Sequence, residues 1–383
     1  MHIKRPHGAV ALTEARRSEA PPSEVAYESL EEFVCRHGQY FDSYLATEPG
    51  RWNFWSRSRR GLISCALSGP NVLCGGGLIA PADHREELLG EFIESAAHQK
   101  LHVVFFNISD EAVPIFRKFG FQATKWGEEP VVDLGHCTWS GKSFEWVRRQ
   151  TNFCLRQGLA ASEVRPDQLD PQQWSSTMDE LLVVSADSLS RKAQAAPMTF
   201  FEGQIENHEL GLRRLFVARS EYGAGRIEAF VVCNPMHHGT SWATELYRRR
   251  PDSVRGTMAF LFHYLLNQMQ SEGIRQVGLC LDPGQGCAQR TPGDSSLVHR
   301  SMQFGNRYLS FLFDIAGQRH FKSRFRPRYE SRYVCSWPKS TIGGYVAFAK
   351  VSGLFNISLK KLASACLDRL RKRGARKTLS SMD

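Results

Sequence analysis

Hydrophobic and polar positions along the chain follow two different periods. Apolar residues at every second position predict strands, and apolar residues three or four positions apart predict helices. The expected strands are residues 62–67, 71–74, 101–106, 121–126, 131–134, 215–219, 227–233, 241–250, 274–281 and 332–337. The expected helices are residues 27–44, 86–99, 107–119, 142–158, 172–187 and 258–272, with part of 297–316. Because both halves alternate strands and helices in this way, we expect an α+β fold of two units with mixed β-sheets, of the acyltransferase type.

Residues 241–258 carry the most informative pattern. Apolar and small or charged residues alternate up to Pro251, as in a strand that the proline ends. Asp252 or Ser253 is then expected to cap a helix with three- and four-residue apolar steps. A basic loop that leads into a helix N-terminus favours an anion, because the free N–H groups and the helix dipole both face it.

Three consecutive glycines, residues 75–77, stand between an expected strand and an expected helix. A glycine-rich turn before a helix can hold a phosphate group. The following Lys-Ser/Thr pair and the spaced G-x-G-x-x-G pattern of phosphate-binding loops are both missing here. We therefore predict a tight turn rather than a phosphate site.

Composition divides the chain into four parts. Residues 1–26 are polar, rich in Pro and Ala and aperiodic, which predicts a disordered leader. Residues 27–135 and residues 136–338 each hold one α+β unit. Residues 339–383 combine an apolar helical pattern, interrupted at Gly353, with many Lys and Arg residues. This basic amphipathic tail suits a peripheral contact with anionic lipid, nonspecific binding to RNA, or packing on the domain.

The formal net charge of +10 favours an anionic partner such as nucleic acid, anionic lipid or a phosphorylated substrate, and it is equally compatible with a merely basic soluble protein. The ten cysteines form no C-x-x-C pair, which argues against a zinc knuckle and favours reduced thiols in the cytoplasm. We expect no metal site and no cofactor. No apolar run has the length of a signal peptide or a membrane span.

A set of short motifs, in the order in which they stand here, resembles the cytosolic domain of bacterial phosphatidylglycerol lysyltransferases. The resemblance extends over residues 37–338. The motifs are residues 127–134 (GEEPVVDL), 141–144 (GKSF), 148–152 (RRQTN), 249–252 (RRPD), 256–258 (GTM), 321–325 (FKSRF) and 329–333 (YESRY).

The resemblance implies a tandem of two acetyltransferase-like (GNAT-type) folds, with residues 136–338 as the catalytic one. It also implies transfer of an aminoacyl group from charged tRNA to a lipid hydroxyl, and soluble relatives transfer to small molecules instead. The family's acidic and arginine positions on the central strand correspond to Glu245 and Arg248, and its lysine near the end to Lys322. Two positions differ from the family pattern, because Ala259 replaces an acidic residue and Arg255 an asparagine.

An aminoacyl-tRNA ester is already activated, so the site must hold the donor, position an acceptor and stabilise an oxyanion, without a nucleophilic side chain. Glu245 is expected to accept the acceptor's proton or to bind the donor's α-ammonium. The alternative is a surface carboxylate paired with Arg248. The expected catalytic residues are Glu245, Arg248 and Lys322. The expected substrate-binding residues are Arg249, Arg250, Asp252, Arg255, Gly256, Thr257, Arg324 and Tyr329.

The arginines of the loop after the central strand match phosphate oxygens of tRNA or lipid, or lie solvated on the surface. A second basic stretch, residues 321–329, interleaves Lys and Arg with Phe and Tyr. This alternation suits the single-stranded end of an RNA through stacking and phosphate contacts, and a half-buried edge strand shows the same pattern. The histidines His237, His238 and His320 are expected in turns or packing rather than catalysis.

The leading hypothesis is an aminoacyl-tRNA-dependent transferase whose acceptor is phosphatidylglycerol or a related anionic lipid, located in the cytoplasm or at the inner face of the membrane. The first alternative keeps the same donor and has a soluble small-molecule acceptor. The second is an acyl-CoA N-acyltransferase of the related fold, and the third is a noncatalytic RNA- or membrane-binding protein.

Overall fold

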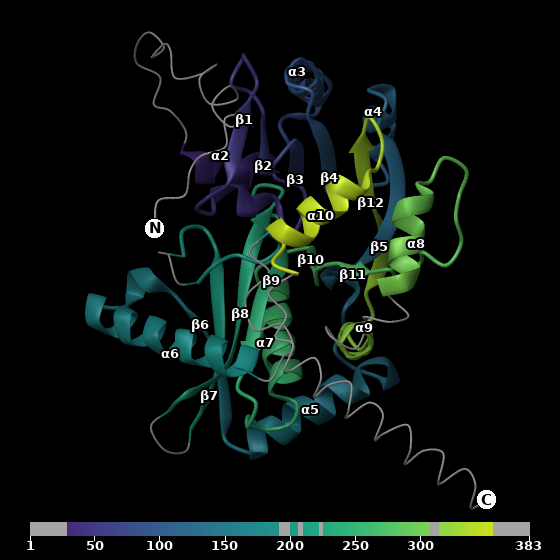
Figure 1. The fold of residues 1–383 in the computed structure, drawn as a ribbon. Coiled ribbons are helices and arrows are strands. Elements are labelled where there is room, and N and C mark those ends of the chain that lie inside the picture. Colours follow the sequence, from purple (N-terminus) through teal and green to yellow (C-terminus); the bar gives the residue numbers. More distant parts are fainter. Residues whose placement is uncertain (1–28, 191–199, 206–209, 222–224, 306–313, 355–383) are drawn as a thin grey trace, which may run out of the picture.

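A computed structural model describes residues 29–190, 200–205, 210–221, 225–305 and 314–354. In these residues one mixed sheet runs through both halves of the chain (Figure 1). Its strand order is β1-β2-β3-β4-β12-β5-β10-β9-β8-β7-β6, and β11 pairs with β5 off this path. The expected α+β class with a mixed sheet is confirmed. The expected leader, residues 1–26, and most of the expected tail lie outside the described residues.

The strands are β1 (Trp52–Trp55), β2 (Leu62–Ser68), β3 (Asn71–Ile79), β4 (His102–Ser109), β5 (Gln122–Asp133), β6 (Leu159–Val164), β7 (Arg214–Ser220), β8 (Ile227–Met236), β9 (Ser241–Arg249), β10 (Gln276–Gly278), β11 (Asp282–Pro283) and β12 (Arg328–Trp337). The α-helices are α2 (Leu30–His37), α3 (Arg85–His98), α4 (Val113–Lys118), α5 (Glu145–Arg156), α6 (Pro171–Ser190), α7 (Thr257–Ser271), α8 (Ser296–Phe304), α9 (Ile315–Ser323) and α10 (Ile342–Val351). The short 3₁₀ helix η1 (Ser43–Thr47) bears on the argument below.

Each half of the sheet contains one parallel strand pair, β3 with β4 and β10 with β9. The other strand pairs of the described residues are antiparallel. The repetition agrees with the alternating pattern of the sequence. The expected tandem of acetyltransferase-like units is confirmed.

The parallel strands of the second half separate after a short register. Pairing of β10 with β9 ends at Gly278 and Ala243. Beyond that point β9 continues beside β8 to Arg249, whereas the chain after β10 turns to β5, where Leu279 N–H donates to the Pro130 carbonyl at 2.8 Å. Beyond Gly278 and Ala243 the two strands therefore share no further backbone pairing in the described residues, and we call such a divergence of parallel strands an opening.

The first half has a corresponding opening, but its own chain fills it. Pairing of β3 with β4 ends at Cys74 and Phe105. Beyond it, the Ser43 hydroxyl donates to the Gly76 carbonyl at 2.9 Å, and Asn107 Nδ2 donates to Asp42 Oδ2 at 2.7 Å. Residues around η1 thus lie between the diverging ends of β3 and β4.

The tight turn expected at residues 75–77 is wrong, because these glycines lie inside β3. Gly76 and Gly77 have φ of 78° and 69°, which favours glycine. A Cβ at Gly76 would lie 2.8 Å from the Ser43 Cα, and one at Gly77 would overlap the Tyr40 ring. The glycines therefore allow the close approach of the segment that fills the first opening.

Replacing Gly77 with alanine is expected to destabilise the fold by about 2–5 kcal/mol, because left-handed strain adds to overpacking against Tyr40. Gly69→Ala is the matched control, since Gly69 has φ of 58° and nothing lies within 4 Å of its added Cβ. That variant should lose only about 1–2 kcal/mol. Urea unfolding measures both. Equal losses would show that the packing of Tyr40 on Gly77 contributes nothing.

Strand β12 comes from the end of the second unit and completes the sheet of the first. It lies between β4 and β5 and is antiparallel to both (Figure 1). Residues 328–337 are thus integrated with strands of residues 102–133. The domain boundary at residue 135 stays a prediction. The topology shows in addition that one strand from beyond this boundary, β12, belongs to the sheet of the first unit.

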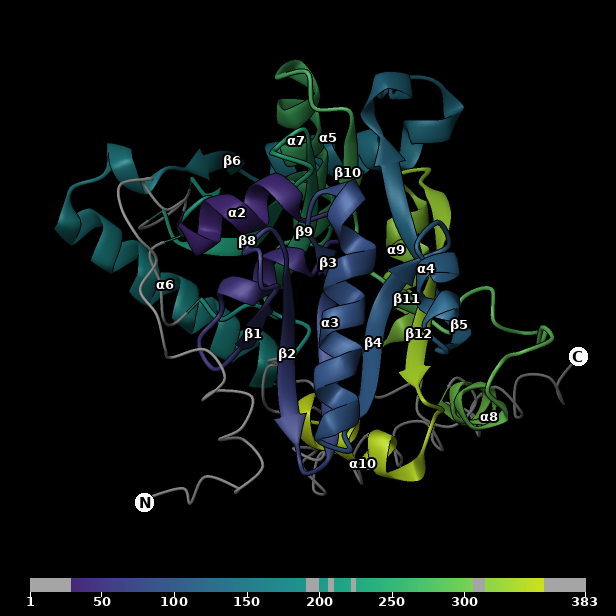
Figure 2. The same cartoon turned by 90° about the horizontal axis from the view of Figure 1, so that it is seen from above.

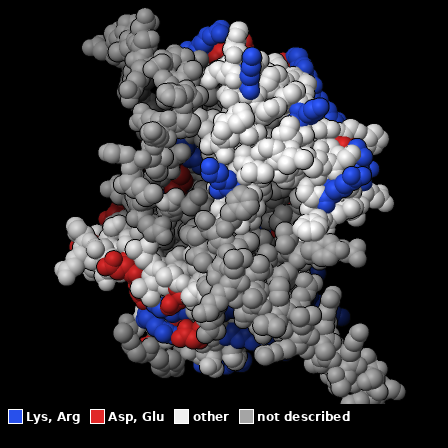
Figure 3. Space-filling model, in the orientation of Figure 1, with Lys and Arg blue, Asp and Glu red and all other residues white. Residues whose placement is uncertain are grey.

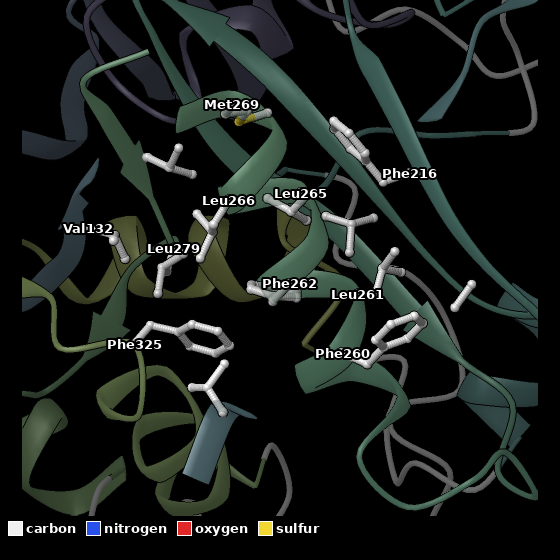
Figure 4. Close-up of a cluster of buried hydrophobic side chains, with 14 of the residues drawn as sticks. Val132, Phe216, Phe260, Leu261, Phe262, Leu265, Leu266, Met269, Leu279 and Phe325 are labelled. Carbon is white, nitrogen blue, oxygen red and sulfur yellow. The ribbon is translucent and has the colours of Figure 1, made fainter. Parts of the chain in front are cut away.

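Helix α7 forms the centre of the larger hydrophobic core. Its residues Phe262, Leu265 and Met269 are buried together with side chains of β7 and β10, including Phe216, and with Phe325, which follows α9 (Figure 4). The sequence predicted this helix and its buried face. In the first half, α3 packs over one face of β2, β3 and β4 (Figure 2), and α10 covers the other face.

Several expected boundaries differ from the structure. The helix expected over residues 27–44 ends at His37, because Gly38 is extended and the chain then enters the first opening. The helix expected from residue 107 begins at Val113, since Asn107 lies in β4. The two short strands expected in residues 121–134 form the single strand β5, which is paired on both edges.

Candidate functional site

The divergence of β9 and β10 forms the centre of the candidate site. Thr244 Oγ1 donates to the Gly278 carbonyl at 3.3 Å, and the Cys280 thiol donates to the Thr244 carbonyl at 2.7 Å. The same thiol also contacts the Glu245 carbonyl at 3.9 Å. The next residue on β9 is Glu245.

Glu245 is the extra residue of a β-bulge. Leu246 pairs with Val232 and Thr244 pairs with Cys233, so Glu245 has no partner on β8. A bulge re-aims the side chains that follow it. As a result Glu245 and Arg248, which lie three positions apart, both contact the segment of residues 202–203.

Glu245 is buried, with 5% of its surface exposed. One carboxylate oxygen accepts the Gly203 N–H, and Oε2 has no hydrogen-bond partner among the described residues. Burial raises the pKa of Glu245 to about 8; the Gly203 N–H and Arg213 oppose the rise, whereas Glu202 and Glu48 add to it. A carboxyl group with this pKa can accept and return a proton near neutral pH.

Arg248 is also buried and forms an ion pair with Glu202 at 2.5 Å. Its Nη1 donates to the Tyr247 carbonyl at 3.0 Å, and Nε has no partner among the described residues. The alternative of a surface carboxylate at Glu245 paired with Arg248 is therefore wrong. Both side chains contact the segment of residues 202–203, and each is bound to a different residue of it.

Lys322 lies on α9 with 1% of its surface exposed. Its ammonium donates to the carbonyls of Cys280 at 3.0 Å and Leu281 at 3.3 Å, and to Asp282 Oδ1 at 2.9 Å. Burial alone lowers the pKa of Lys322, but Tyr247 and Asp282 outweigh it and raise the pKa, so the ammonium stays charged. All three N–H donors hold the segment that diverges from β9.

Sequence reasoning missed four charged residues of this region. Asp282 begins the Gly/Pro-rich loop after β10 and forms an ion pair with Lys322. Glu202 forms an ion pair with Arg248. Glu48 forms an ion pair with Arg213 at 3.0 Å, and both of these side chains are buried. Glu48 and Arg213 lie 165 positions apart, so no local motif connects them.

The basic loop after β9 divides into bound and exposed arginines. Arg250 forms an ion pair with Asp187 at 2.7 Å and donates a hydrogen bond to the Ile227 carbonyl, whereas Arg249 and Arg255 are exposed. Asp252 is exposed and pairs with Arg226 at 3.2 Å, which lowers its pKa through a hydrogen bond.

The expected cap at Asp252 or Ser253 is wrong. Gly256, with φ of 92°, is the N-cap of α7, and no side chain caps it. The Ser253 hydroxyl instead donates to the Arg250 carbonyl at 2.8 Å, and the Thr257 hydroxyl donates to the Val254 carbonyl at 2.6 Å. These hydroxyls are engaged within the turn before the helix begins.

The alternation of residues 321–329 forms neither a single strand nor a row of stacking rings. Phe321 and Phe325 pack on Phe262 in the core, with ring centroids 5.1 and 5.8 Å away, so they cannot stack on a base. Residues up to Ser323 are helical, and Tyr329, which lies in β12, is exposed. Both expected interpretations are therefore wrong for the phenylalanines.

Arg324 extends the site toward α5. Its guanidinium lies 5.5 Å from the centroid of the Trp146 ring and contacts His320 at 2.8 Å. Arg326 donates to the Ser143 carbonyl at 3.1 Å. The Cys154 thiol of α5 contacts the Arg255 carbonyl, so the basic loop and the end of α9 both meet this helix.

Among the described residues, no group of three or more His, Cys, Asp or Glu side chains is arranged to hold a metal ion. In the same part of the chain, no helix combines the length and the apolar character needed to cross a bilayer. His237 contacts Ser241 at 2.8 Å, and burial lowers its pKa.

Two solved structures share this fold. The L-PGS from Bacillus licheniformis is 24% identical, with a TM-score of 0.69 over 85% of this chain and 95% of that chain. The C-terminal domain of a putative lysylphosphatidylglycerol synthetase from Agrobacterium fabrum is 22% identical, with a TM-score of 0.69 over 86% of this chain and 95% of that chain.

Residues 31–336 match the family model "Phosphatidylglycerol lysyltransferase, C-terminal", and the chain belongs to this family. Phosphatidylglycerol lysyltransferase of Staphylococcus epidermidis is 23% identical over 86% of this chain and 36% of its own length. The enzyme of that name from Bacillus subtilis is 25% identical over 66% of this chain and 29% of its own length. The chain thus spans about a third of the length of these curated relatives.

Proposed function

We propose that this domain transfers an aminoacyl group from charged tRNA to the hydroxyl of phosphatidylglycerol or a related lipid. The observation that carries the proposal is Glu245, a buried carboxyl group with a pKa of about 8 where β9 and β10 separate. Family membership supports the lipid acceptor, since the relatives are named phosphatidylglycerol lysyltransferases.

In the proposed reaction Glu245 accepts the proton of the acceptor hydroxyl as its oxygen attacks the ester carbonyl of the donor. The new carbon–oxygen bond forms, the bond to the ribose oxygen breaks, and the proton passes to that leaving oxygen. Arg248 Nε, which lacks a partner among the described residues, supplies a hydrogen bond to the oxyanion. Lys322 positions residues 280–282 rather than contacting the substrate.

The donor is proposed to lie on a basic face formed by α5, the end of α9 and the loop before α7. We define this face by the exposed or half-exposed residues Arg149, Arg156, Arg255, Arg324 and Arg326. Net charge alone does not locate it. In the orientation of Figure 3, Lys and Arg dominate the upper right, whereas acidic and basic side chains mix at the lower left. The support comes from the contacts of Arg324 and Arg255 with α5, next to Lys322.

The double variant Arg255→Glu/Arg324→Glu is expected to weaken tRNA binding uniformly across tRNA sequences. The slope of log K against log salt concentration should fall by about 1 for each lost phosphate contact. Arg57→Glu/Arg60→Glu makes the same charge change at exposed arginines of the first half and should leave the slope unchanged. Fluorescence titration at several salt concentrations measures the slopes of both double variants. Equal slopes would show that the donor does not bind to the basic face.

The acceptor is tested by mass spectrometry of lipids from cells that express the wild type or Glu245→Gln. We expect a phosphatidylglycerol species heavier by one aminoacyl residue in the wild type only, and its mass identifies the amino acid. No new lipid in either strain would exclude this acceptor. Transfer by purified protein from charged tRNA to small amines or alcohols would then establish a soluble acceptor, and RNase-resistant transfer would establish an acyl-CoA donor.

A further inference from the structure

Helices α8 and α10 form a surface that the proposed reaction does not use (Figure 1). The Tyr345 side chain of α10 forms a hydrogen bond with the Ser301 side chain of α8, so the two helices contact each other. On α10, Ile342, Val346 and Lys350 stand four positions apart and therefore line one side of the helix. Ile342 is 72% exposed, Val346 is 54% exposed, and Lys350 is exposed as well. The outer side of α10 is thus apolar over its first turns and basic at its end.

The charges of this surface have one sign. The sequence contains no Asp or Glu in residues 295–313 or in residues 331–367. Arg300 on α8, Lys339 before α10 and Lys350 are exposed. In Figure 3, drawn in the orientation of Figure 1, this part of the described surface is mostly uncharged, and its charged side chains are mainly Lys and Arg. We call the surface of Arg300, Lys339, Ile342, Val346 and Lys350 the α8–α10 face.

The inner side of α10 reaches the candidate site through aromatic rings. The Phe348 ring is stacked on Phe106, with ring centroids 5.0 Å apart, and its centroid lies 5.7 Å from that of Phe201. Phe201 directly precedes Glu202, which forms the ion pair with Arg248. The aromatic rings thus connect the α8–α10 face with the segment that Glu245 and Arg248 contact.

An anionic bilayer fits this face better than RNA does. Apolar side chains such as Ile342 and Val346 are stabilised when they enter the boundary between lipid headgroups and acyl chains. Basic side chains near the bilayer surface add to the attraction for anionic lipid. RNA is held by phosphate charges and by stacking of its bases on aromatic rings, and neither isoleucine nor valine supplies such contacts.

We propose that the α8–α10 face docks this domain on an anionic lipid bilayer, with Ile342 and Val346 in the headgroup boundary. Arg300, Lys339 and Lys350 then lie against anionic headgroups. The inference rests on the proposed function for the lipid acceptor, and it adds the surface by which the domain meets the membrane. The lipid contact expected for the tail of residues 339–383 is thereby assigned to particular residues and extended to α8. Docking depends on charge and apolar burial, so anionic lipids of equal charge should serve equally.

Co-sedimentation of the purified chain with vesicles tests the face. The vesicles are phosphatidylcholine alone, or phosphatidylcholine with an equal mole fraction of phosphatidylglycerol or of phosphatidylserine. We expect binding to both anionic vesicles that falls with salt, and weak binding to phosphatidylcholine alone. The apolar variant Ile342→Ser/Val346→Ser should weaken binding to anionic vesicles by about tenfold or more through lost apolar burial. The charge variant Lys339→Glu/Lys350→Glu should weaken it by about tenfold or more through lost attraction.

Exposed residues elsewhere in the chain provide matched controls. Val183→Ser/Leu212→Ser matches the apolar variant, since Val183 is 49% exposed and Leu212 is 41% exposed outside the face. Arg57→Glu/Arg60→Glu matches the charge variant. Both controls should bind vesicles like the wild type. The proposal is overturned if the two face variants bind like the wild type, if the controls lose as much, or if binding requires phosphatidylglycerol specifically. Loss of tRNA binding in the apolar variant would assign the face to RNA instead.

Transfer to two forms of the acceptor separates docking from catalysis. A short-chain phosphatidylglycerol below its micelle concentration needs no bilayer. The apolar variant should use this soluble acceptor like the wild type, and its kcat/KM for phosphatidylglycerol in vesicles should fall by about tenfold or more. Face-dependent vesicle binding without transfer to either acceptor would retain the docking surface and reject the proposed acceptor. Transfer to both acceptors that does not depend on the face would do the reverse.

Discussion

Glu245→Gln is expected to lower the rate of aminoacyl transfer by about 10²–10⁴-fold, the usual contribution of a general base. Glutamine keeps the shape and can still accept the Gly203 N–H, but it cannot take a proton. In the wild type, kcat/KM should rise with pH up to about 8 and then level off, because the carboxylate is the active form. The variant should lose this rise.

The same substitution has an opposite effect on stability at high pH. Native Glu245 keeps its proton up to about pH 8, whereas the unfolded carboxyl loses it near its ordinary value of 4.5. Between these values the native state binds the extra proton, so the contribution of this group to the free energy of unfolding falls as pH rises, by about 1.4 kcal/mol per unit. Glu245→Gln should remove this fall. Urea unfolding at pH 5 and pH 8 measures it, and a variant that is fully active or declines like the wild type contradicts the assignment.

Lys322→Met is expected to cost about 3–5 kcal/mol of stability and to abolish transfer. Removing the ammonium leaves Asp282 buried with an uncompensated charge and frees two carbonyls of the diverging segment. Thermal or urea unfolding measures the first effect, and product formation under conditions that keep the variant folded measures the second.

A double-mutant cycle separates the ion pair from the position of the segment. Lys322→Met/Asp282→Asn removes both charges, so it should recover much of the stability that Lys322→Met loses. Transfer should not recover, because the carbonyls of Cys280 and Leu281 still lack their donor. Stability unchanged by Lys322→Met, or full activity in the double variant, would show that Lys322 does not hold the site together.

The charged cluster also explains why the two halves depend on each other. Glu48 follows η1 in the first half, Arg213 precedes β7, and Glu245 lies on β9. Strand β12 in turn joins the sheet of the first half directly after α9, which carries Lys322. Both connections cross between the units. A fragment limited to residues 136–338 would therefore lack Glu48 and also the first-half strands that pair with β12. We expect the halves to act as one unit in binding the donor.

Local patterns determined much of what the sequence predicted correctly. The apolar period of α7 and the alternation of β9 follow from the side-chain spacing of single elements, which neighbouring residues encode. The ordered motifs located the family, and their central strand located Glu245 and Arg248. A strand with an internal Gly and Pro, such as β5, was divided in two because its pairing on both edges is not a local property.

Tertiary structure alone decided how these elements form a site. The bulge at Glu245 depends on the register with β8, and the burial that raises its pKa depends on segments distant in the chain. Glu48 meets Arg213 across 165 positions, a contact that no period or motif encodes. Likewise, residues 321–329 were expected either to contact the end of an RNA or to form a half-buried edge strand, but α9 and the turn after it place Phe321 and Phe325 in the core. The sequence by itself determined the elements and the chemical groups they carry; long-range pairing and desolvation decided which groups meet and which remain charged.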